Sequence, residues 1–427
     1  MIRRGRVFRG VGVVALVAAL AACSSSSKSS SSSTTSTSQS TSGTSTGVTS
    51  TSGSTAAQAA GAPIKVGLVC ECSGPFVGGA AVPGEDVYKA FVNTVNASGG
   101  INGHPIQLIT KDDTNNPGTS VTDIQALLAA HVDAIVSVTS ADELWASTVQ
   151  AAGIPVIGVQ DTNAPFNTNP DFYPEGETAA NENVAYVGVI KASGATNFGV
   201  IYCVESPQCS ESVAQLKPLG QKHGTPLIYS AGIAYNAPNF TAQCLAAQQA
   251  HVQALIIEDI SSVLQKVGTD CDKQGYDPIF VTGGGSYSPA LATTPGFKSN
   301  SWYWYSNVPY WANTPATQAM TSALDKYYPG LTRDTVLWNQ SGANAWPSGV
   351  LLEHAVKAGG LGPSDTPSAA EIVKGLNSLQ GDNLDGWYAP MTFVAGQAHP
   401  QNCWYTVHVQ NGTPQLVNNG QVTCQTS

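Results

Sequence analysis

The chain has 427 residues, which is enough for two ordinary domains with cores of their own. Only 11% of the residues are charged, and 18 basic residues against 28 acidic ones give a formal net charge of -10. Four of the five arginines lie within the first nine residues, so the rest of the chain holds Arg333 alone. This composition excludes a nucleic-acid-binding protein, because phosphate attraction needs clustered positive charge. It also excludes collagen, coiled-coil and multi-span membrane proteins.

The N-terminus has the pattern of an export signal. A basic segment, 1–10, precedes an apolar run of twelve residues, 11–22, which is shorter than the roughly 20 residues that a membrane-spanning helix needs. The run ends in Leu20-Ala21-Ala22-Cys23, which resembles the bacterial lipobox. We therefore expect a lipoprotein signal peptide over 1–22 and a lipid on the Cys23 thiol. The alternative is an ordinary signal peptide with a chance cysteine after it.

The segment 23–62 predicts a disordered tether. Between Ser24 and Thr55, 26 of 32 residues are Ser or Thr. Such a stretch cannot bury enough apolar surface to offset its chain entropy. As a flexible coil it would reach about 30 Å on average. It would connect the membrane to a folded body that begins near residue 63.

In the first part of this body, short β-branched runs alternate with helical patterns. The predicted strands are 64–69, 106–110, 134–138 and 156–159. The predicted helices between them are 85–96, 123–130 and 139–150. Strands alternating with helices over short connections predict an α/β fold with a parallel, doubly wound sheet.

The same alternation starts again near residue 179. The predicted helices are 179–192, 210–223, 240–251 and 263–274, and the predicted strands are 198–203, 226–230, 254–257 and 279–282. Two successive runs of similar size predict two similar lobes. Aromatic residues alternate over Trp302–Tyr305, which would place the tryptophans on one face and the tyrosines on the other.

The last part of the chain predicts three helices and a hairpin. The helices are 315–328, with Thr314 as N-cap, 341–358, with a kink or a late start at Pro347, and 369–378. Two tail strands, 403–409 and 415–422, flank the turn signal Asn411-Gly412.

Four segments of the first lobe resemble one protein family. They are IKVGLVCECSGPFVGG, NASGGINGHPIQLITKDDTNNP, DAIVSVTSADELWA and AGIPVIGV. These segments are similar in order, spacing and motif to the branched-chain amino acid binding proteins, which are type I solute-binding proteins of ABC importers. The resemblance covers 63–160 closely and the second half mainly in strand–helix rhythm. It implies two Rossmann-like lobes joined by three crossover segments, with lobe one at 63–174 plus 307–388 and lobe two at 175–306 plus 389–427.

Ligands of open α/β sheets meet the loops at the carboxyl ends of the strands. The candidate loops are 71–77, 139–142, 160–163, 204–208, 258–261 and 283–288. The family typically holds a ligand carboxylate with hydroxyl and backbone N–H groups of the second and third loops. By that resemblance the ligand-binding residues here are Ser140, Ala141, Gln160 and Thr162. The loop 139–142 also opens a predicted helix, whose N–H groups would favour an anion, although Ser and Thr there also serve as simple N-caps.

The resemblance implies an acidic partner for the ligand ammonium in the loop 283–287, where this chain has Gly284. An α-ammonium would need Glu258 or Asp259 on the neighbouring loop, so the departure argues against a standard α-amino acid ligand. Ser286 completes the polar candidates. Phe76 and Tyr287, with Trp145, would form an apolar wall or pack as ordinary core. We expect Phe76, Asp259, Ser286 and Tyr287 in the binding site.

Eight cysteines remain after Cys23, and an even number in an exported protein suits disulfides. Local positions favour the pairs Cys203–Cys209, Cys244–Cys271 and Cys403–Cys424, although eight cysteines allow 105 pairings. Cys70 and Cys72 are left over, because a bridge across one residue would be strained. They predict no metal site either, since no second Cys/His pair lies at close spacing.

The folded body shows no pattern typical of an enzyme, a cofactor or a metal. Its histidines are scattered, and the pair Asp112-Asp113 is not followed by EF-hand spacing. The G-x-S-x-G match at 43–47 and the S-x-x-K match at 25–28 fall in the predicted tether, where no strand–turn–helix can form.

The sequence thus predicts a monomeric extracytoplasmic lipoprotein, anchored to the bacterial cell membrane by lipidated Cys23. It would capture a small polar or amphipathic solute of the amino acid, carboxylic acid or amide class for an ABC permease. The alternatives are a ligand sensor that feeds a signalling partner and an envelope-interaction lipoprotein with a vestigial cleft. A hydrolase is the weakest alternative, because the sequence shows no nucleophile with an activating base beside it.

Overall fold

The computed structural model describes residues 59–73, 84–159, 163–176, 178–205, 207–298, 301–329, 331 and 340–425. The predicted signal peptide, the Cys23 lipid site and most of the predicted tether lie outside these residues, as do Phe76, Gln160 and Thr162. The end of the predicted tether belongs to the folded body, because the Gly61 backbone N–H donates to the Gly103 carbonyl at 2.9 Å. Within the described residues, no helix has the length and apolar character needed to cross a membrane.

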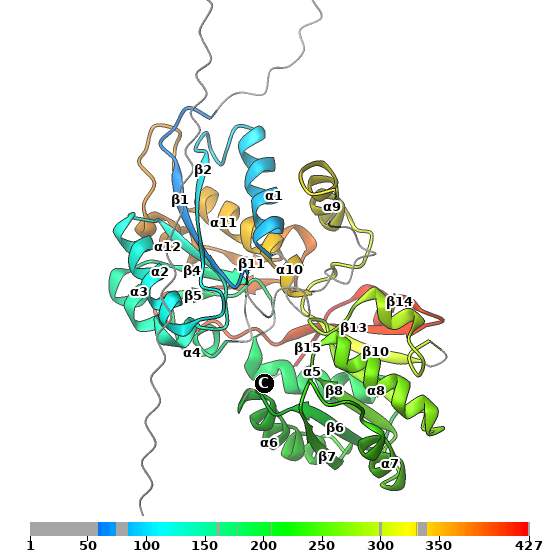
Figure 1. The fold of residues 1–427 in the computed structure, drawn as a ribbon. Coiled ribbons are helices and arrows are strands. Elements are labelled where there is room, and N and C mark those ends of the chain that lie inside the picture. The colour runs from blue at the N-terminus through cyan, green and yellow to red at the C-terminus, as the bar shows by residue number, and fades with distance from the viewer. Residues whose placement is uncertain are drawn as a thin grey trace, which may run out of the picture. The chain divides into compact units, whose positions relative to one another are not determined.

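The first sheet has five parallel strands in the order β2-β1-β3-β4-β5. Figure 1 labels β1, β2, β4 and β5 of this sheet. They are β1 (Ile64–Cys70), β2 (Ile106–Asp112), β3 (Ala134–Val138), β4 (Val156–Val159) and β5 (Phe172–Tyr173). The helices that connect them are α1 (Gly84–Ala97), α2 (Pro117–Ala129), α3 (Ala146–Ala152) and α4 (Pro165–Thr168).

Two predicted helices of this lobe are wrong at their starts. The helix predicted over 123–130 begins earlier, at Pro117, because the Asn116 side chain caps it there, and the other begins later than expected. The range 139–150 was expected to be helical throughout, but the chain forms a 3₁₀ turn at Asp142–Leu144, and α3 begins only at Ala146. The physical reason is the buried Asp142, whose carboxylate accepts a hydrogen bond from the Ser137 hydroxyl on β3 at 2.5 Å. This contact ties the loop to the strand end, so the regular helix starts after it.

The second sheet continues the same pattern and adds the C-terminal tail. Its order is β14-β13-β10-β9-β8-β6-β7, with β15 paired to β13. Its strands are β6 (Phe198–Cys203), β7 (Leu227–Ile233), β8 (Ala254–Glu258), β9 (Ile279–Gly283), β10 (Trp302–Ser306), β13 (Cys403–Gln410), β14 (Thr413–Leu416) and β15 (Thr423–Cys424). Its helices are α5 (Ala179–Ala192), α6 (Pro207–Lys222), α7 (Thr241–Gln249) and α8 (Ser261–Lys273). Strand β13 runs antiparallel to β10, and the other pairs from β10 to β7 are parallel.

The predicted turn at Asn411-Gly412 is confirmed. Both residues have positive φ values, 53° and 73°, and they join Gln410 to its partner Thr413. This left-handed backbone suits Asn and Gly and matches the twist of a two-residue hairpin. The second tail strand is shorter than expected, since β14 ends at Leu416 and a 3₁₀ turn precedes β15.

The late helices follow the predicted order. They are α9 (Pro315–Tyr327), α10 (Gln340–Ala343), α11 (Ala345–Gly359) and α12 (Ala369–Leu376), and a small hairpin of β11 (Gln380–Asp382) and β12 (Met391–Thr392) follows. Thr314 is the N-cap of α9, and its hydroxyl accepts from the Thr317 backbone N–H at 3.2 Å. Pro347 stands in the first turn of α11, where its missing N–H costs nothing.

Both main sheets are covered on two faces, which confirms the doubly wound α/β fold. In the first sheet, Val66 and Leu68 share a core with α1 and α11, while Val69 and Ile135 share another with α2 and α3. In the second sheet the same alternation separates the α5 face from the α8 face, with Ile256 on the first and Leu255 and Ile257 on the second. Because successive strand residues point to opposite faces, a strand buried on both reads as a continuous apolar run.

The structure places all eight cysteines of the folded body in disulfide geometry. Three pairs are those that the sequence favoured, Cys203–Cys209, Cys244–Cys271 and Cys403–Cys424. The fourth, Cys70–Cys72, differs from the sequence analysis, which left both residues unpaired. The turn at Glu71 brings their Cα atoms to 5.1 Å, within the range that a disulfide spans. Peptide mapping of the unreduced, exported protein would check all four bonds.

We expect Gly375→Ala to destabilise the protein by about 2 kcal/mol or more, by overpacking. A Cβ atom at Gly375 on α12 would overlap the carbonyl oxygen of Ala355 on α11, so the two helices would have to separate. Denaturant unfolding measures the loss. Gly118→Ala is the matched control, because a Cβ there meets only the Asn116 side chain, at 3.3 Å. Equal stability of the two variants would contradict the prediction.

Candidate functional site

A cavity of about 130 Å³ lies where the carboxyl ends of strands from both sheets meet. Val159 ends β4 of the first sheet, while Glu258, Gly283 and Tyr305 lie at or near the ends of β8, β9 and β10 of the second. The remaining lining residues are Glu182, Tyr186, Gly285, Ser286, Asn307, Gln340, Ser341 and Asn344. This is the edge of the sheets at which the sequence analysis expected ligand contacts.

Two half-buried carboxyl groups dominate the electrostatics of the cavity. Glu182, in the first turn of α5, accepts a short hydrogen bond from the Tyr305 hydroxyl. Burial raises the pKa of Glu182. Burial, and after it the charge of Glu182, raises the pKa of Glu258 to about 8, against which a hydrogen bond to Ser212 acts. Glu258 therefore tends to keep its proton near neutral pH when no cation is beside it.

Gln340 occupies the space left by the glycine loop. Its side-chain carbonyl accepts from the Ser306 hydroxyl at 2.8 Å and from the Asn307 backbone N–H at 3.2 Å. A Cβ atom at Gly284 would overlap this same carbonyl oxygen. The position at which the family resemblance implied an acid is thus packed against a neutral carboxamide from α10.

The predicted anion-binding loop is occupied by the chain itself. The Ser140 backbone N–H donates to Glu71 Oε1 at 2.9 Å, and the Ser140 hydroxyl donates to the same oxygen. The Ala141 backbone N–H donates to the Thr139 hydroxyl at 3.2 Å. Neither Ser140 nor Ala141 lines the cavity. Glu71 stands where the resemblance placed a ligand carboxylate.

The other predicted site residues divide into two groups. Ser286 lines the cavity, and its contact with a ligand stays a prediction. Asp259 and Tyr287 do not line it. Asp259 Oδ1 accepts from the Ile260 backbone N–H at 2.7 Å, and the acid of this loop that lines the cavity is its neighbour Glu258.

Aromatic packing accounts for the residues expected as an apolar wall. Tyr287 stacks on Trp304 with 4.3 Å between ring centroids and anchors the glycine loop to β10. Trp145 is fully buried and stacks on Phe172. The predicted alternation on β10 is confirmed, since Tyr305 on the opposite face contacts Tyr186.

Among the cavity residues that the sequence analysis missed are Glu182, Tyr186, Gln340 and Asn344. They lie on α5, on α10 and just before α11, and no strand end precedes them closely in the sequence. The acidic first turn of α5 was the only local signal for Glu182. It has an ordinary structural explanation, because acidic residues stabilise helix N-termini.

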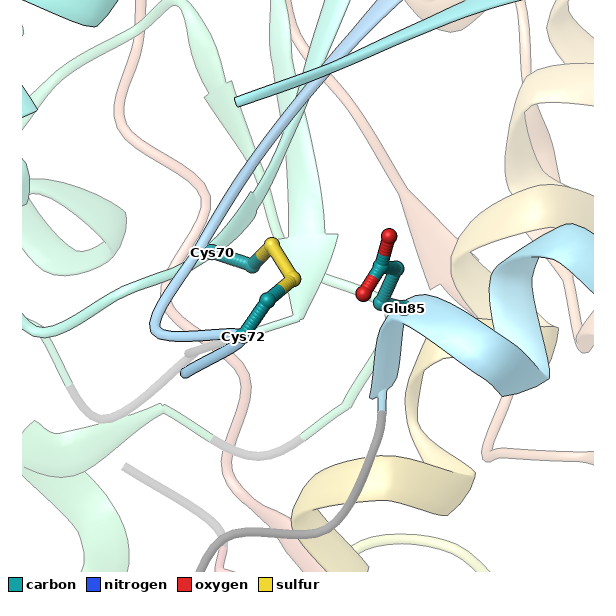
Figure 2. Close-up of side chains that lie close together, drawn as sticks. All are labelled: Cys70, Cys72 and Glu85. Carbon is teal, nitrogen blue, oxygen red and sulfur yellow. A yellow bond between two sulfur atoms is a disulfide. The ribbon is translucent and has the colours of Figure 1, made fainter. Parts of the chain in front are cut away.

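One other cluster has the composition of a metal site. The ligand atoms of Cys70, Cys72 and Glu85 lie within 4.8 Å of one another. Figure 2 shows the two sulfur atoms joined as a disulfide beside Glu85. Glu85 also pairs with Lys89 one turn along α1. Because metals bind thiolates and not disulfide sulfurs, this cluster is no metal site while the bond is intact.

We expect the ligand-free protein to lose stability as the pH rises from about 5 to about 9. The pKa of Glu258 is about 8 in the folded chain against 4.5 as its ordinary value, so the native state binds more protons between these values. This contribution is fully present below 4.5 and is lost as the pH rises through about 8. Glu258→Gln should flatten the decline in melting temperature, measured by thermal unfolding at several pH values. Glu211→Gln, an exposed change on α6, should keep it, and identical slopes in both variants would contradict the prediction.

Comparisons with known proteins agree with this geometry. The family model described as periplasmic binding protein matches residues 63–414. A branched-chain amino acid ABC transporter protein from Thermus thermophilus with bound valine superposes with a TM-score of 0.73 at 13% identity, covering 85% of this chain and 97% of that one. Among curated proteins, none matches the chain.

Two further solved structures share the fold. An extracellular ligand-binding receptor from Verminephrobacter eiseniae ef01-2 has a TM-score of 0.69 at 15% identity, covering 83% of this chain and 99% of that one. A fatty acid ABC transporter substrate-binding protein from Thermomonospora curvata has a TM-score of 0.67 at 16% identity, with 85% and 92% covered. The two lobes, the cavity at their strand ends and the family match over most of the sequence lead to one conclusion. The chain belongs to the periplasmic binding protein family and has its type I fold.

Proposed function

We propose that the protein is a solute-binding lipoprotein that captures a small polar or amphipathic solute and delivers it to an ABC permease. Its family is extracytoplasmic and consists of solute-binding proteins, not enzymes. The observation that carries the proposal is the cavity of about 130 Å³, which lies at strand ends of both sheets and is lined mostly by polar side chains. A solute that contacts both lobes favours the conformation in which both contacts form, so binding shifts the conformational equilibrium.

The remaining parts of the proposal come from the sequence. The lobes extend over 63–174 plus 307–388 and 175–306 plus 389–427. A lipid on Cys23 would hold the monomeric protein at the outer face of the membrane, within reach of a permease. Two of the structural relatives are described as proteins of amino acid and fatty acid ABC transporters, which supports an importer over a sensor.

Thermal unfolding of the full-length protein against a solute panel tests this function. The panel holds amino acids, their deaminated acids, amides, urea, polyols and alkylamines. A solute that binds only the native state stabilises it by about 2.7 kcal/mol at a hundredfold excess over Kd. Ser341→Phe puts a large side chain into the cavity and should abolish the shift in melting temperature. The exposed Ser322→Phe on α9 should leave this shift unchanged.

Two outcomes would count against the proposal. A shift that survives in Ser341→Phe would place binding elsewhere. No shift with any member of the panel would favour the envelope-interaction lipoprotein with a vestigial cleft. For a solute that does bind, loss of its uptake when the chain is deleted would separate an importer from a sensor.

A further inference from the structure

The cavity presents buried hydrogen-bond acceptors that have no donor within the described part of the chain. Three lining residues each have a buried oxygen with no hydrogen-bond partner among the described residues: Glu258 Oε2, Asn307 Oδ1 and Asn344 Oδ1. Asn307 and Asn344 are each only 3% exposed, so bulk water does not compensate for the missing partners. The Asn344 amide nitrogen lies 3.5 Å from the Val159 carbonyl, which orients its oxygen away from that carbonyl. A buried acceptor without a donor costs free energy, so these atoms favour an occupant that brings donors.

The same cavity has negative charge without a counter-charge of its own. Glu182 and Glu258 both line it, and the described lining residues include no Lys, Arg or His. Tyr305 donates to Glu182, and the Gln340 carbonyl already accepts two hydrogen bonds, so these groups do not neutralise the pair. Removing a carboxylate from water is costly unless a cation is beside it.

Among the described residues, the donors that the resemblance assigned to a ligand carboxylate are already in use. In the loop after β3, the Ser140 N–H and hydroxyl both donate to Glu71, and the Ala141 N–H donates to Thr139. The nearby Asp142 carboxyl is buried and accepts from Ser137. A zwitterionic solute would therefore find acceptors for its ammonium group and no free donors at this loop for its carboxylate.

We propose that the cavity binds a small organic cation with several N–H donors and no carboxylate, such as an alkylammonium, amidinium or guanidinium ion. Glu182 and Glu258 supply the counter-charges, and the amide oxygens of Asn307 and Asn344 accept the remaining N–H groups. The cavity volume of about 130 Å³ restricts the cation to a few heavy atoms. This inference rests on the proposed solute-binding function and specifies the chemical class of its solute.

Binding should release a proton near neutral pH. The pKa of Glu258, raised to about 8 by burial and by the charge of Glu182, means that this carboxyl group retains a proton without a ligand, and a bound cation replaces it. The groups that face Glu258 are Glu182 and Tyr186 from α5, with Tyr305 from β10 beside them and the Ser212 hydroxyl from α6. A neutral or anionic solute would not displace this proton.

Isothermal titration calorimetry of the full-length protein tests the charge requirement. The probes are methylguanidinium and butylammonium, with their neutral counterparts methylurea and butanol, and with leucine and isovalerate as zwitterion and anion. We expect at least one cation to bind about tenfold or more tightly than its neutral counterpart, because hydrogen bonds to charged groups are the stronger ones. The heat should change with the ionisation enthalpy of the buffer, which reports the released proton.

Two variants locate the site. Glu258→Gln, and independently Glu182→Gln on another element, should weaken cation binding by about tenfold or more. Glu211→Gln removes an exposed charge on α6 and should change binding by no more than about twofold. Circular dichroism confirms that each variant folds before its affinity is measured.

Three results would overturn the inference. Tighter binding of leucine or isovalerate than of either cation would refute the charge assignment and leave solute binding intact. Cation binding that is lost in Asp259→Asn but kept in Glu258→Gln would show that Asp259, and not Glu258, supplies the counter-charge. Failure of both cations to bind would refute the ligand class, and the broader panel above would then decide separately whether the protein binds any solute.

Discussion

Trp304→Ala is expected to destabilise the native state by about 4 kcal/mol, because a fully buried tryptophan leaves a large cavity when it is truncated. The Trp304 side chain, on β10, is fully buried. Its ring contacts Tyr287 at 4.3 Å, Trp302 at 5.4 Å and Trp311 at 5.4 Å between centroids. The cost comes from lost packing, since its indole nitrogen has no hydrogen-bond partner among the described residues.

The same change should weaken ligand binding. Tyr287 directly follows the cavity residue Ser286 and is held by its stack on Trp304. Without that stack, the glycine loop loses its anchor and part of its preorganisation. Urea unfolding measures the stability, and titration with the best solute of the panel measures the affinity.

Two controls separate packing from a general effect on β10. Trp304→Phe keeps an aromatic ring under Tyr287 and should cost clearly less than alanine. Tyr303→Ala removes a partly buried ring from the opposite face, where it stacks on His408, and should leave the glycine loop unaffected. A loss below about 1 kcal/mol for Trp304→Ala would contradict the role assigned to this aromatic cluster.

The double variant Cys244→Ala/Cys271→Ala should lower stability by about 3–4 kcal/mol, because a closed loop of this length restricts the unfolded chain strongly. The two cysteines are 27 residues apart in sequence and join the fully buried faces of α7 and α8. Denaturant unfolding of oxidised wild type and variant measures the difference. The entropic stabilisation grows with the length of the loop that the bond closes.

The pair Cys203–Cys209 is the matched comparison. Its separation is 6 residues, so Cys203→Ala/Cys209→Ala should cost about 2 kcal/mol in the same assay. A larger loss for this short loop than for Cys244–Cys271 would contradict the loop-length argument. Free thiols at Cys244 and Cys271 in the exported wild-type protein would show that this disulfide does not form, and the predicted stability loss would then have no cause.

In two places, a side chain of this chain occupies the position of a group that the family resemblance implies. Where an acid was expected, Gly284 leaves room for the Gln340 carbonyl. Where a ligand carboxylate was expected, Glu71 accepts from Ser140. Glu71 is the residue between Cys70 and Cys72, and a disulfide there restricts the backbone that carries it. The second change acts against a ligand carboxylate, and the first leaves Glu182 and Glu258 as the acids that line the cavity.

Local patterns were sufficient for the elements and the edge of the sheets at which the site lies. The strand over Ala134–Val138 and the α5 helix over Ala179–Ala192 match their expected bounds. The Thr314 cap and the Asn411-Gly412 turn also appear as expected. These features depend on neighbours within a few residues, through side-chain periodicity, capping hydrogen bonds and allowed φ values. The strand-end rule then located the candidate loops without further information.

Which residues line the cavity depended on the tertiary structure. Sequence reasoning chose Asp259, but the cavity is lined by the preceding residue, Glu258, because the end of β8 directs that side chain inward. Glu182 reaches the Tyr305 hydroxyl across 123 residues of sequence, and Ser140 reaches Glu71 across 69. Such contacts follow from strand order and from the crossover connections between the sheets, which no local pattern encodes. The sequence by itself therefore determined the fold class and the edge of the sheets, whereas the packing of distant elements decided which side chains line the cavity and that two of them are acidic.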